Sequence, residues 1–344
     1  MGDLRGGMDF RRGELVAVGE PPARRAAGRL VLGLRGGGEA GEVVERWRAG
    51  AAVSAGTALA VDGEGGESGV LPVDGRVERV GAVEGGVGWG GALGVAVVAG
   101  PTADGLCATS LDRRAPGGSE VADWVSALVG TGPWPTVGHG GGLAGVLASA
   151  AGRSVRRVIC VGLDRFSPVA DRSSLLSGFA DDAALGLRLI GEILGARRSV
   201  MLVDREVRWG GAVRRACRRF SVQHRAVENA YPSADPTVVV GAHTPGRARL
   251  KPGRDPLETG VVLVEPWSVI RLARWVTRGR LDVVRPVFVS WPLRRGGLSV
   301  RWAWPGEAVG DWLGGASGEG VESGAEEGRR RVVWGDAMGG EATR

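Results

Sequence analysis

Apolar and polar positions alternate most regularly between residues 156 and 280. The run from Arg157 to Leu163 is short and almost wholly apolar, which is typical of a strand buried on both faces. The stretch from Asp181 to Leu194 repeats its large apolar residues at helical spacing and ends at Gly195. Strands that alternate with helices predict an α/β layer on a largely parallel sheet. Similar patterns predict a strand at 199–203 and helices at 209–220 and 267–277, with further apolar runs at 237–240 and 260–264.

The first hundred residues follow a different pattern, in which short β-type runs are interrupted by glycine. Such runs occur at residues 30–32, 70–73, 77–80 and 95–98. Regular turn signals between short strands predict a small all-β barrel or sandwich. Residues 1–28 are rich in Gly, Arg and Pro, so we expect a flexible N-terminus there.

A helix and a glycine-rich loop are predicted between these two regions. Ser119 is a good N-cap, and the apolar residues that follow it share one helical face, which predicts a helix over 119–130. Pro133 and Pro135 end regular structure, and the loop then runs from residue 138 to residue 145.

The last part of the chain, from about residue 284, predicts a small α+β unit. It contains strand-like runs at 287–291, 298–304 and 332–334, a short helix at 307–313, and a Gly/Glu-rich insert at 314–328. The expected organisation is therefore a flexible N-terminus, an all-β domain, an α/β domain and a final α+β domain, with boundaries at 1–28, 29–105, 115–282 and 283–344.

Composition narrows the class of protein. The chain has 344 residues, of which 43% are hydrophobic and 24% charged, which indicates a globular protein. Its net charge of +6 is spread along the chain, so we expect no nucleic-acid partner. Lys251 is the single lysine among 44 basic residues. An arginine-rich surface suits phosphate or carboxylate partners, but we interpret the bias as codon usage in a GC-rich genome.

The cysteines and the hydropathy exclude several other classes. The three cysteines, Cys107, Cys160 and Cys217, contain no C-x-x-C pair, so the chain has no four-cysteine zinc or iron–sulfur site of its own. We expect Cys160 to be a buried thiol. No apolar run reaches the roughly 20 residues of a membrane span, and the start lacks a signal core. These features predict a cytoplasmic protein, soluble or docked peripherally on the inner face of the cell membrane.

Several local motifs occur in an order that matches one family. Residues 137–142 read V-G-H-G-G-G, which resembles a V-G-x-G-G-A-G-F-P-T flavin loop, and residues 164–168 resemble D-E-F-E-P. Residues 44–60 resemble V-x-x-G-x-x-V-x-x-G-x-x-I/L-A, and residues 260–264 resemble a G-V-V-V-x-N strand. Collinear over roughly residues 30–342, these motifs resemble the C subunit of Rnf-type ion-translocating electron-transport complexes. The flavin-binding subunit of respiratory complex I is a more distant resemblance.

This resemblance implies a fold and an activity. The α/β core would be a Rossmann-like flavin-binding layer, preceded by a barrel-sandwich hybrid and followed by a small SLBB-type, ubiquitin-like unit. The family passes hydride from NADH to a flavin, here flavin mononucleotide (FMN), and sends electrons to iron–sulfur clusters at a membrane ion pump. Other subunits of a membrane-bound electron-transport complex are the partners that the resemblance implies.

Departures from the family pattern leave a second hypothesis open. The chain stops before the ferredoxin module, so no iron–sulfur cluster is expected in it. The Phe-Pro-Thr of the flavin loop is replaced by residues 144–146, and both glutamates of D-E-F-E-P are replaced, by Arg165 and Ser167. The Asn that follows the G-V-V-V-x-N strand in the family is replaced here by Glu265, after residues 260–264. A redox-silent paralogue that acts as a binding or scaffold subunit is the alternative.

The candidate cofactor site begins with the glycine loop. Gly138, Gly140, Gly141 and Gly142 offer backbone N–H groups without a Cβ in the way, and a helix is predicted from Leu143, whose N-terminus would add its dipole. An FMN phosphate fits such a loop, and the alternative is a purely structural turn. A G-x-G-x-x-G reading of the same loop is disfavoured, because prolines rather than a buried strand precede it.

Acidic residues complete the candidate site. Asp164 and Asp171 follow the predicted strand 157–163, at the carboxyl edge where α/β proteins bind ligands. Asp171 is equally well explained as a helix or turn cap. His139, in the loop, is expected to face solvent rather than a cofactor, and no metal spacing links it to His224 or His243. Arg214, Arg215, Arg218 and Arg219 share one helix, and we favour a solvated helix face over a docking surface.

Overall fold

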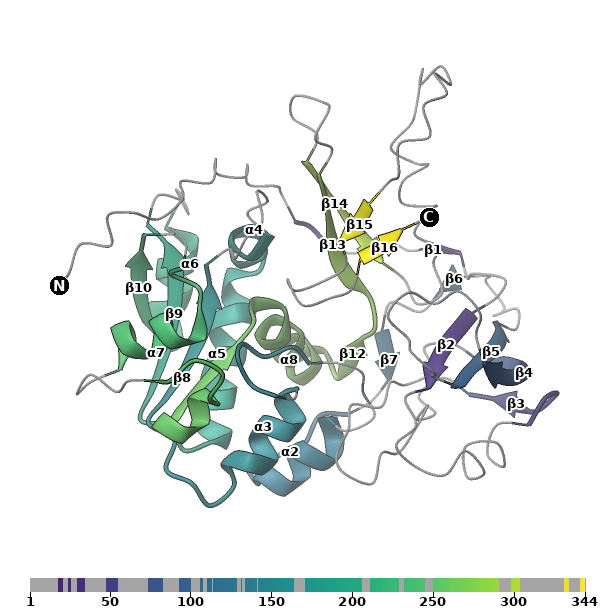
Figure 1. Cartoon of the computed structure of the whole chain (residues 1–344), viewed down its shortest axis with the longest axis horizontal. Helices are drawn as coiled ribbons and strands as arrows, with labels where there is room; N and C mark the ends of the chain where they lie inside the picture. The colour runs from purple at the N-terminus through teal and green to yellow at the C-terminus, as the bar shows by residue number, and fades with distance from the viewer. Residues whose placement is uncertain are drawn as a thin grey trace.

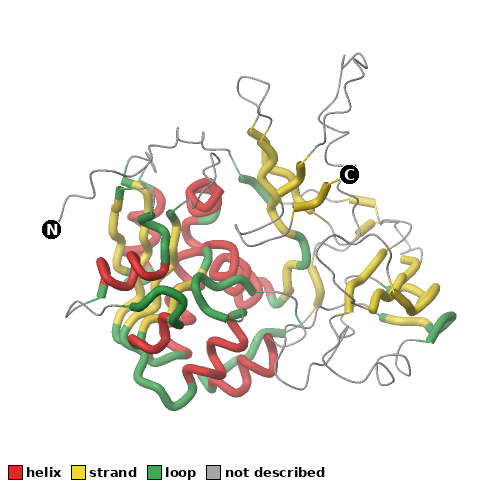
Figure 2. Tube along the Cα trace, in the orientation of Figure 1, coloured by secondary structure: helices red, strands yellow, loops and turns green. Residues whose placement is uncertain are grey.

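The structure is a computed structural model of the chain (Figures 1 and 2). It describes residues 18–20, 24–25, 30–34, 48–54, 74–82, 93–99, 106–107, 110–112, 114–128, 131, 134–140, 142–163, 171–205, 211–228, 232–244, 250–290, 298–303, 331–333 and 341–343.

A four-stranded, wholly parallel sheet forms the centre of the described structure. Its strands follow the order β10-β9-β8-β11. The central residues of β8, β9 and β11 are apolar and buried, whereas those of the edge strand β10 are half-buried or exposed and include Arg225. The α/β core that the sequence predicts is therefore confirmed. The strands are β8 (Arg157–Gly162), β9 (Arg198–Asp204), β10 (Gln223–Val227) and β11 (Val261–Val264).

Side chains alternate between the two faces of this sheet, and each face has its own hydrophobic core. Val158, Cys160 and Met201 belong to the larger core, with buried residues of several helices, whereas Ile159 and Leu202 belong to the smaller one. Helix α7 (Pro236–His243) packs against the smaller core. The larger core is covered by α2 (Val121–Leu128), α3 (Leu143–Ala150), α4 (Asp171–Gly178), α5 (Ala180–Ile193), α6 (Ala212–Arg219) and α8 (Pro266–Arg278).

Local sequence signals explain where these helices begin and end. Helix α8 starts with Pro266 at its first turn and ends at Gly279, which has φ +66°. Asp235 caps α7, since its side chain accepts a hydrogen bond from the Thr237 N–H at 2.8 Å. The apolar run 237–240 therefore lies in a helix and not in a strand.

The N-terminal part contains a second, antiparallel sheet of four strands in the order β2-β5-β4-β3. The β-type runs at 30–32, 77–80 and 95–98 are confirmed as strands, and the run at 70–73 lies outside the described residues. A barrel-sandwich hybrid stays a prediction. The strands are β2 (Leu30–Leu34), β3 (Ala52–Val53), β4 (Gly75–Ala82) and β5 (Leu93–Ala99).

Short antiparallel pairs connect the remaining segments. β1 (Arg24–Arg25) pairs with β6 (Leu106–Cys107), and β7 (Ser110–Asp112) pairs with β12 (Arg280–Asp282). The C-terminal part contains the pairs β13 (Arg285–Ser290) with β14 (Leu298–Ala303) and β15 (Arg331–Val333) with β16 (Glu341–Thr343). The helix and insert expected at 307–328 lie outside the described residues, so the SLBB-type unit stays a prediction.

Aromatic and ionic contacts join the C-terminal hairpin and the N-terminal segment to the α/β core. Trp302 of β14 packs edge-on against Trp267 of α8, with ring centroids 5.6 Å apart, and its indole N–H donates to the Gly19 carbonyl at 3.2 Å. Glu20 binds Arg274 of α8 through both carboxylate oxygens, at 2.9 and 2.7 Å. No helix within the described ranges is long and apolar enough to cross a membrane.

Candidate functional site

The segment before α3 runs along the free edge of β11. Thr136 forms an antiparallel bridge with Val264, and the Val137 N–H donates to the Leu263 carbonyl at 3.1 Å. The loop then returns, because the Leu143 N–H donates to the Trp134 carbonyl at 2.9 Å. The glycine loop is thus a closed excursion that starts and ends beside the carboxyl end of β11. The G-x-G-x-x-G interpretation requires a parallel strand before the loop. An edge segment precedes it instead, so this interpretation stays disfavoured.

Gly138 has a packing role in this loop. Its φ is +74°, in the left-handed region that favours glycine, and a Cβ there would lie 2.5 Å from the Pro236 Cγ at the start of α7. Close approach between the loop and α7 therefore accounts for this glycine. Its role in cofactor binding stays a prediction.

Gly140 and Gly142 lie in more open surroundings. A Cβ on Gly140 would meet nothing within 4 Å, and the same holds for Gly145 in the first turn of α3. Gly142 is the N-cap of α3 and provides no side chain to cap it. The N–H groups of the first turn, including those of Ala144 and Gly145, have no intrahelical acceptor. Such N–H groups are the donors that helix N-termini offer to anions, and α3 begins at the predicted residue. Gly141 lies outside the described residues.

His139 contradicts the expectation of a solvent-facing side chain. Its side chain is 1% exposed. The ring Nδ1 lies 2.7 Å from the Asp255 carboxylate, and Nε2 accepts a hydrogen bond from the Leu263 N–H at 3.0 Å. Burial lowers the pKa of this imidazole, although Asp255 acts in the opposite direction. His139 fixes the loop to β11, because an edge strand offers free N–H groups that the ring can satisfy.

An ion pair occupies the carboxyl edge of the sheet. Arg172, in the first turn of α4, binds the Glu265 carboxylate that follows β11, and also donates to the Leu163 carbonyl at 3.2 Å. Their side chains are 7% and 15% exposed. Asp171 is the first residue of α4, but its side chain is not described, and Asp164 lies outside the described residues.

Sequence reasoning missed Arg172, although one signal pointed to it. Glu265 stands where the family pattern has a neutral Asn, and a carboxylate placed behind a buried strand needs a cation nearby. Arg172 follows the neighbouring strand β8 at the same edge, so topology brings the two together. The structure therefore groups Arg172 and Glu265 at the edge where Asp164 and Asp171 were expected to act.

Cys160 lies beneath this ion pair, in β8. It is fully buried, and burial raises the pKa of its thiol well above the usual range, with a smaller opposing effect from Arg172. The predicted buried thiol is confirmed. Cys217 is also buried, which raises the pKa of its thiol to about 12. Both cysteines are protonated at neutral pH and unsuited to act as nucleophiles.

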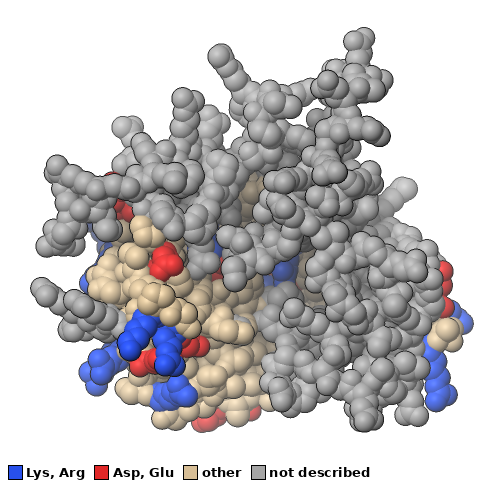
Figure 3. Space-filling view, in the orientation of Figure 1, with Lys and Arg blue, Asp and Glu red and all other residues tan. Residues whose placement is uncertain are grey.

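Other candidate features lie away from the loop. The four arginines of α6 are exposed, while its Val213, Ala216 and Cys217 are buried, so the solvated-face interpretation agrees with the structure. Figure 3 shows basic and acidic side chains intermingled on one face of the α/β unit. Within the described ranges, no group of three or more His, Cys, Asp or Glu residues could hold a metal ion. A groove of about 350 Å³ lies at the amino end of β9 and β10, lined by residues that include Arg188, Glu192, Arg198, Ser199 and Gln223.

Comparisons with known proteins give no close match. No family model and no curated protein matches the sequence. Among solved structures, NAD+-reducing NiFe-hydrogenase in its H2-reduced state is weakly similar, with a TM-score of 0.46, 18% identity, and coverage of 57% of this chain and 39% of that chain. The air-oxidized state gives a TM-score of 0.39 and 17% identity, over 63% of this chain and 45% of that chain. The chain spans less than half the length of either, and TM-scores below 0.5 do not establish a common fold.

Proposed function

We propose that the chain is the flavin-domain core of an electron-transfer subunit, which takes hydride from NADH and passes electrons to partner subunits of a membrane-bound complex. The observation that carries this proposal is the open, uncapped amino end of α3 beside Gly140 and Gly142. The collinear motifs of the Rnf C subunit add to it, because they place a flavin loop at the same residues.

The residues at this loop fit the phosphate of FMN. The N–H groups of Ala144 and Gly145 would donate to phosphate oxygens, and the α3 dipole would favour their negative charge. The open space at Gly140 leaves room for that group. A bound flavin supplies a centre that accepts two electrons as hydride and releases them singly. Glycines at 138 and 141 and acids at 164 and 171 remain candidates for the rest of the cofactor site.

The carboxyl edge favours a second candidate, a redox-silent paralogue that acts as a scaffold. Arg172 and Glu265 are nearly buried and bind one another. Polar groups that are already paired have less to offer a flavin ring or a nicotinamide than groups that face an open crevice. In this second function the fold would be kept for contact with partner subunits.

An absorbance spectrum of the purified full-length chain, before and after addition of FMN, tests both candidates. Under the electron-transfer proposal we expect a flavin band, which NADH bleaches. In the variant Gly140→Leu the Kd for FMN should rise at least tenfold, because the leucine side chain would fill the space beside α3. Gly117→Leu, in an equally open position outside the loop, is the matched control. A chain that takes up no FMN would overturn the proposal and leave the scaffold.

A further inference from the structure

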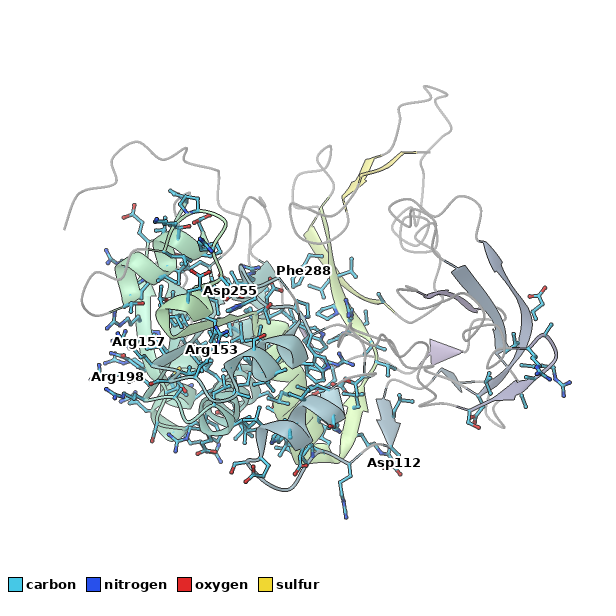
Figure 4. The ribbon with its side chains drawn as sticks, turned by 60° about the horizontal axis from the view of Figure 1, so that its bottom comes forward. Asp112, Arg153, Arg157, Arg198, Asp255 and Phe288 are labelled. Atoms are coloured by element: carbon cyan, nitrogen blue, oxygen red, sulfur yellow. The ribbon has the colours of Figure 1, made fainter. Side chains whose placement is uncertain are left out.

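Three neighbouring strands each place an arginine on the face of the sheet that α7 covers. Arg157 of β8 lies beside Arg198 of β9 in the strand register, as Figure 4 also shows. Arg157 and Arg198 lie two positions before Ile159 and Val200, so their side chains are on the same face of the sheet. Ile159 and Val200 belong to the smaller core beneath α7. Arg225 of β10 shares the face of Val227, which packs against the same core. Three guanidinium groups from adjacent strands therefore lie on one face.

The last turn of α7 meets these arginines. His243 and Thr244 follow Val239 and Val240 by four residues, so they lie on the stripe of α7 that faces the sheet. Arg157 donates to the His243 carbonyl, and Arg225 lies 3.5 Å from the His243 Nδ1. We call Arg157, Arg198 and Arg225 the arginine cluster: Arg157 and Arg225 contact the last residue of α7, and Arg198 lies beside Arg157.

The positive charge of the arginine cluster is not balanced by the described residues. No described carboxylate forms an ion pair with any of its three members. Arg157 is 5% exposed. Burial, together with Arg225 and Arg198, lowers the pKa of Arg157, and burial with the two nearest arginines lowers the pKa of His243 to about 4. His243 is consequently neutral at pH 7, and the arginines keep their charge.

A buried hydroxyl on the residue that follows His243 also lacks a partner within the described part of the chain. Thr244 is 7% exposed, and its Oγ1 makes no hydrogen bond within the described part of the chain. A buried polar group without a partner costs free energy unless a ligand or water satisfies it. Arg157 alone could be explained as a cap for the carbonyls at the end of α7. One carbonyl does not account for Arg198 and Arg225, nor for the unsatisfied hydroxyl.

We propose that the arginine cluster and Thr244 bind a small-molecule phosphate. Guanidinium groups match phosphate oxygens in fork geometry, and the Thr244 hydroxyl adds a neutral donor. The site is distinct from the glycine loop. Gly138 contacts Pro236 at the start of α7, whereas Arg157 and Arg225 of the arginine cluster contact its last residue, about 12 Å away along an eight-residue helix. It therefore does not depend on the function proposed above.

Isothermal titration of the full-length chain with inorganic phosphate tests this proposal, with chloride at equal ionic strength as the reference. We expect saturable binding that Arg225→Gln or Arg198→Gln weakens by about tenfold each, as expected for the loss of a charge-assisted hydrogen bond. Arg218→Gln, on the exposed face of α6, is the matched control and should leave Kd unchanged. Equal weakening by the control, or no saturable heat, would overturn the proposal.

Three further tests locate the phosphate. Among the three histidines, the NMR signal of His243 should shift on titration while that of His139 stays constant. Thr244→Val keeps the charge and shape of the site, and should bind phosphate about threefold to tenfold more weakly while it folds normally. Gly140→Leu alters the other candidate phosphate site, the glycine loop, and therefore distinguishes the two sites. If that variant alone lost binding, the phosphate would be at the glycine loop, and the arginine-cluster proposal would be wrong.

Discussion

His139 joins segments that are far apart in the chain. Because its Nε2 accepts a hydrogen bond from the Leu263 N–H, that nitrogen carries no proton, and the neutral ring must hold its proton on Nδ1, where it donates to Asp255. Protonation would turn Nε2 into a donor that faces another donor. The side chain is thus fixed in one tautomer and cannot relay protons without releasing the loop from β11.

Arg274 is the single side chain whose loss we expect to cost most. It is 1% exposed, and its Nε donates to the Asp282 carboxylate at 2.5 Å while its terminal nitrogens bind Glu20. Arg274→Met would leave the buried Asp282 without its cation, which costs about 3–5 kcal/mol of unfolding free energy. Urea denaturation of the full-length chain measures this change.

The control for this prediction is Arg278, which binds the same Glu20 from a half-exposed position. Arg278→Met should cost no more than about 1 kcal/mol, since exposed ion pairs contribute little. Equal losses in the two variants would show that the burial of Arg274 is not what makes its contacts important.

At the residue scale, the environment of a side chain can be predicted from sequence only where its immediate neighbours in the chain determine it. The apolar run around Cys160 correctly predicts a buried thiol, because a strand with large apolar neighbours leaves no other environment. The exposure of His139 is wrongly predicted, because a loop histidine is polar by type and nothing local reveals the free edge of β11. The Arg172–Glu265 pair requires knowledge of strand order, which local pattern does not contain.

Among the elements, α5 and α8 pack closely together at Gly186. A Cβ on this residue would overlap with the carbonyl oxygen of Val269 in α8. Gly186→Ala should therefore force the helices apart and destabilise the protein by about 1–3 kcal/mol, as other overpacked core positions do. Thermal unfolding followed by circular dichroism checks this result.

Gly241 provides the contrasting case for the same substitution. It lies in α7, is exposed, and would place a Cβ in open space. Gly241→Ala should stabilise the protein by about 0.5–1 kcal/mol, because glycine is a poor helix former. A loss of stability in both variants would mean that the change in packing at Gly186 is not the cause.

Most elements of the α/β core could be predicted from sequence because their signals are local. The spacing of apolar residues predicts α5 and α8, and terminators such as Gly279 are visible in the chain. The identity of α7 is obscured by Val238, Val239 and Val240, which favour strands. Asp235 as N-cap, followed by Pro236 in the first turn, is a local signal for a helix, and it competes with the strand preference of the three valines.

For the whole molecule, we expect stability to fall as pH is lowered from 7 to 4. Burial lowers the pKa of His139 and His224, and that of His243 to about 4. Each neutral histidine therefore contributes stability fully above pH 6.5, and this contribution is lost as pH falls toward the folded pKa. In His243→Gln the loss of unfolding free energy between pH 7 and pH 4 should be smaller by about 1–2 kcal/mol, after allowance for solvent screening.

Two carboxylates modify this profile in opposite directions. The hydrogen bonds of Arg274 and Arg278 lower the pKa of Glu20 to about 2, so its contribution is complete above pH 4.5 and lost below it. Burial raises the pKa of Asp182, which favours the folded state as pH falls. Denaturation at pH 7, 5.5 and 4 measures the histidine contribution, and a further measurement near pH 2.5 measures that of Glu20. A flat profile between pH 7 and pH 4 would contradict neutral, buried histidines.

Long-range contacts are the part of the whole molecule that the sequence does not predict. The separation of Glu20 and Arg274 by 254 positions has no local signature. The pairing of β7 with β12 likewise depends on where distant segments meet. Changes in pattern predict domain boundaries, which stay predictions. The order β10-β9-β8-β11 could not be predicted, because the sequence of a parallel strand does not specify which strands lie beside it.

The segment from Trp134 to His139 has one more consequence, which concerns self-association. Strand β11 is the outermost strand of the parallel sheet, and this segment satisfies part of its backbone through Thr136, Val137 and His139. An uncovered edge would be a template for strand addition by another copy of the chain. The segment from Trp134 to His139 therefore also protects the edge of β11 against strand addition, and a ligand at α3 must bind without displacing this segment.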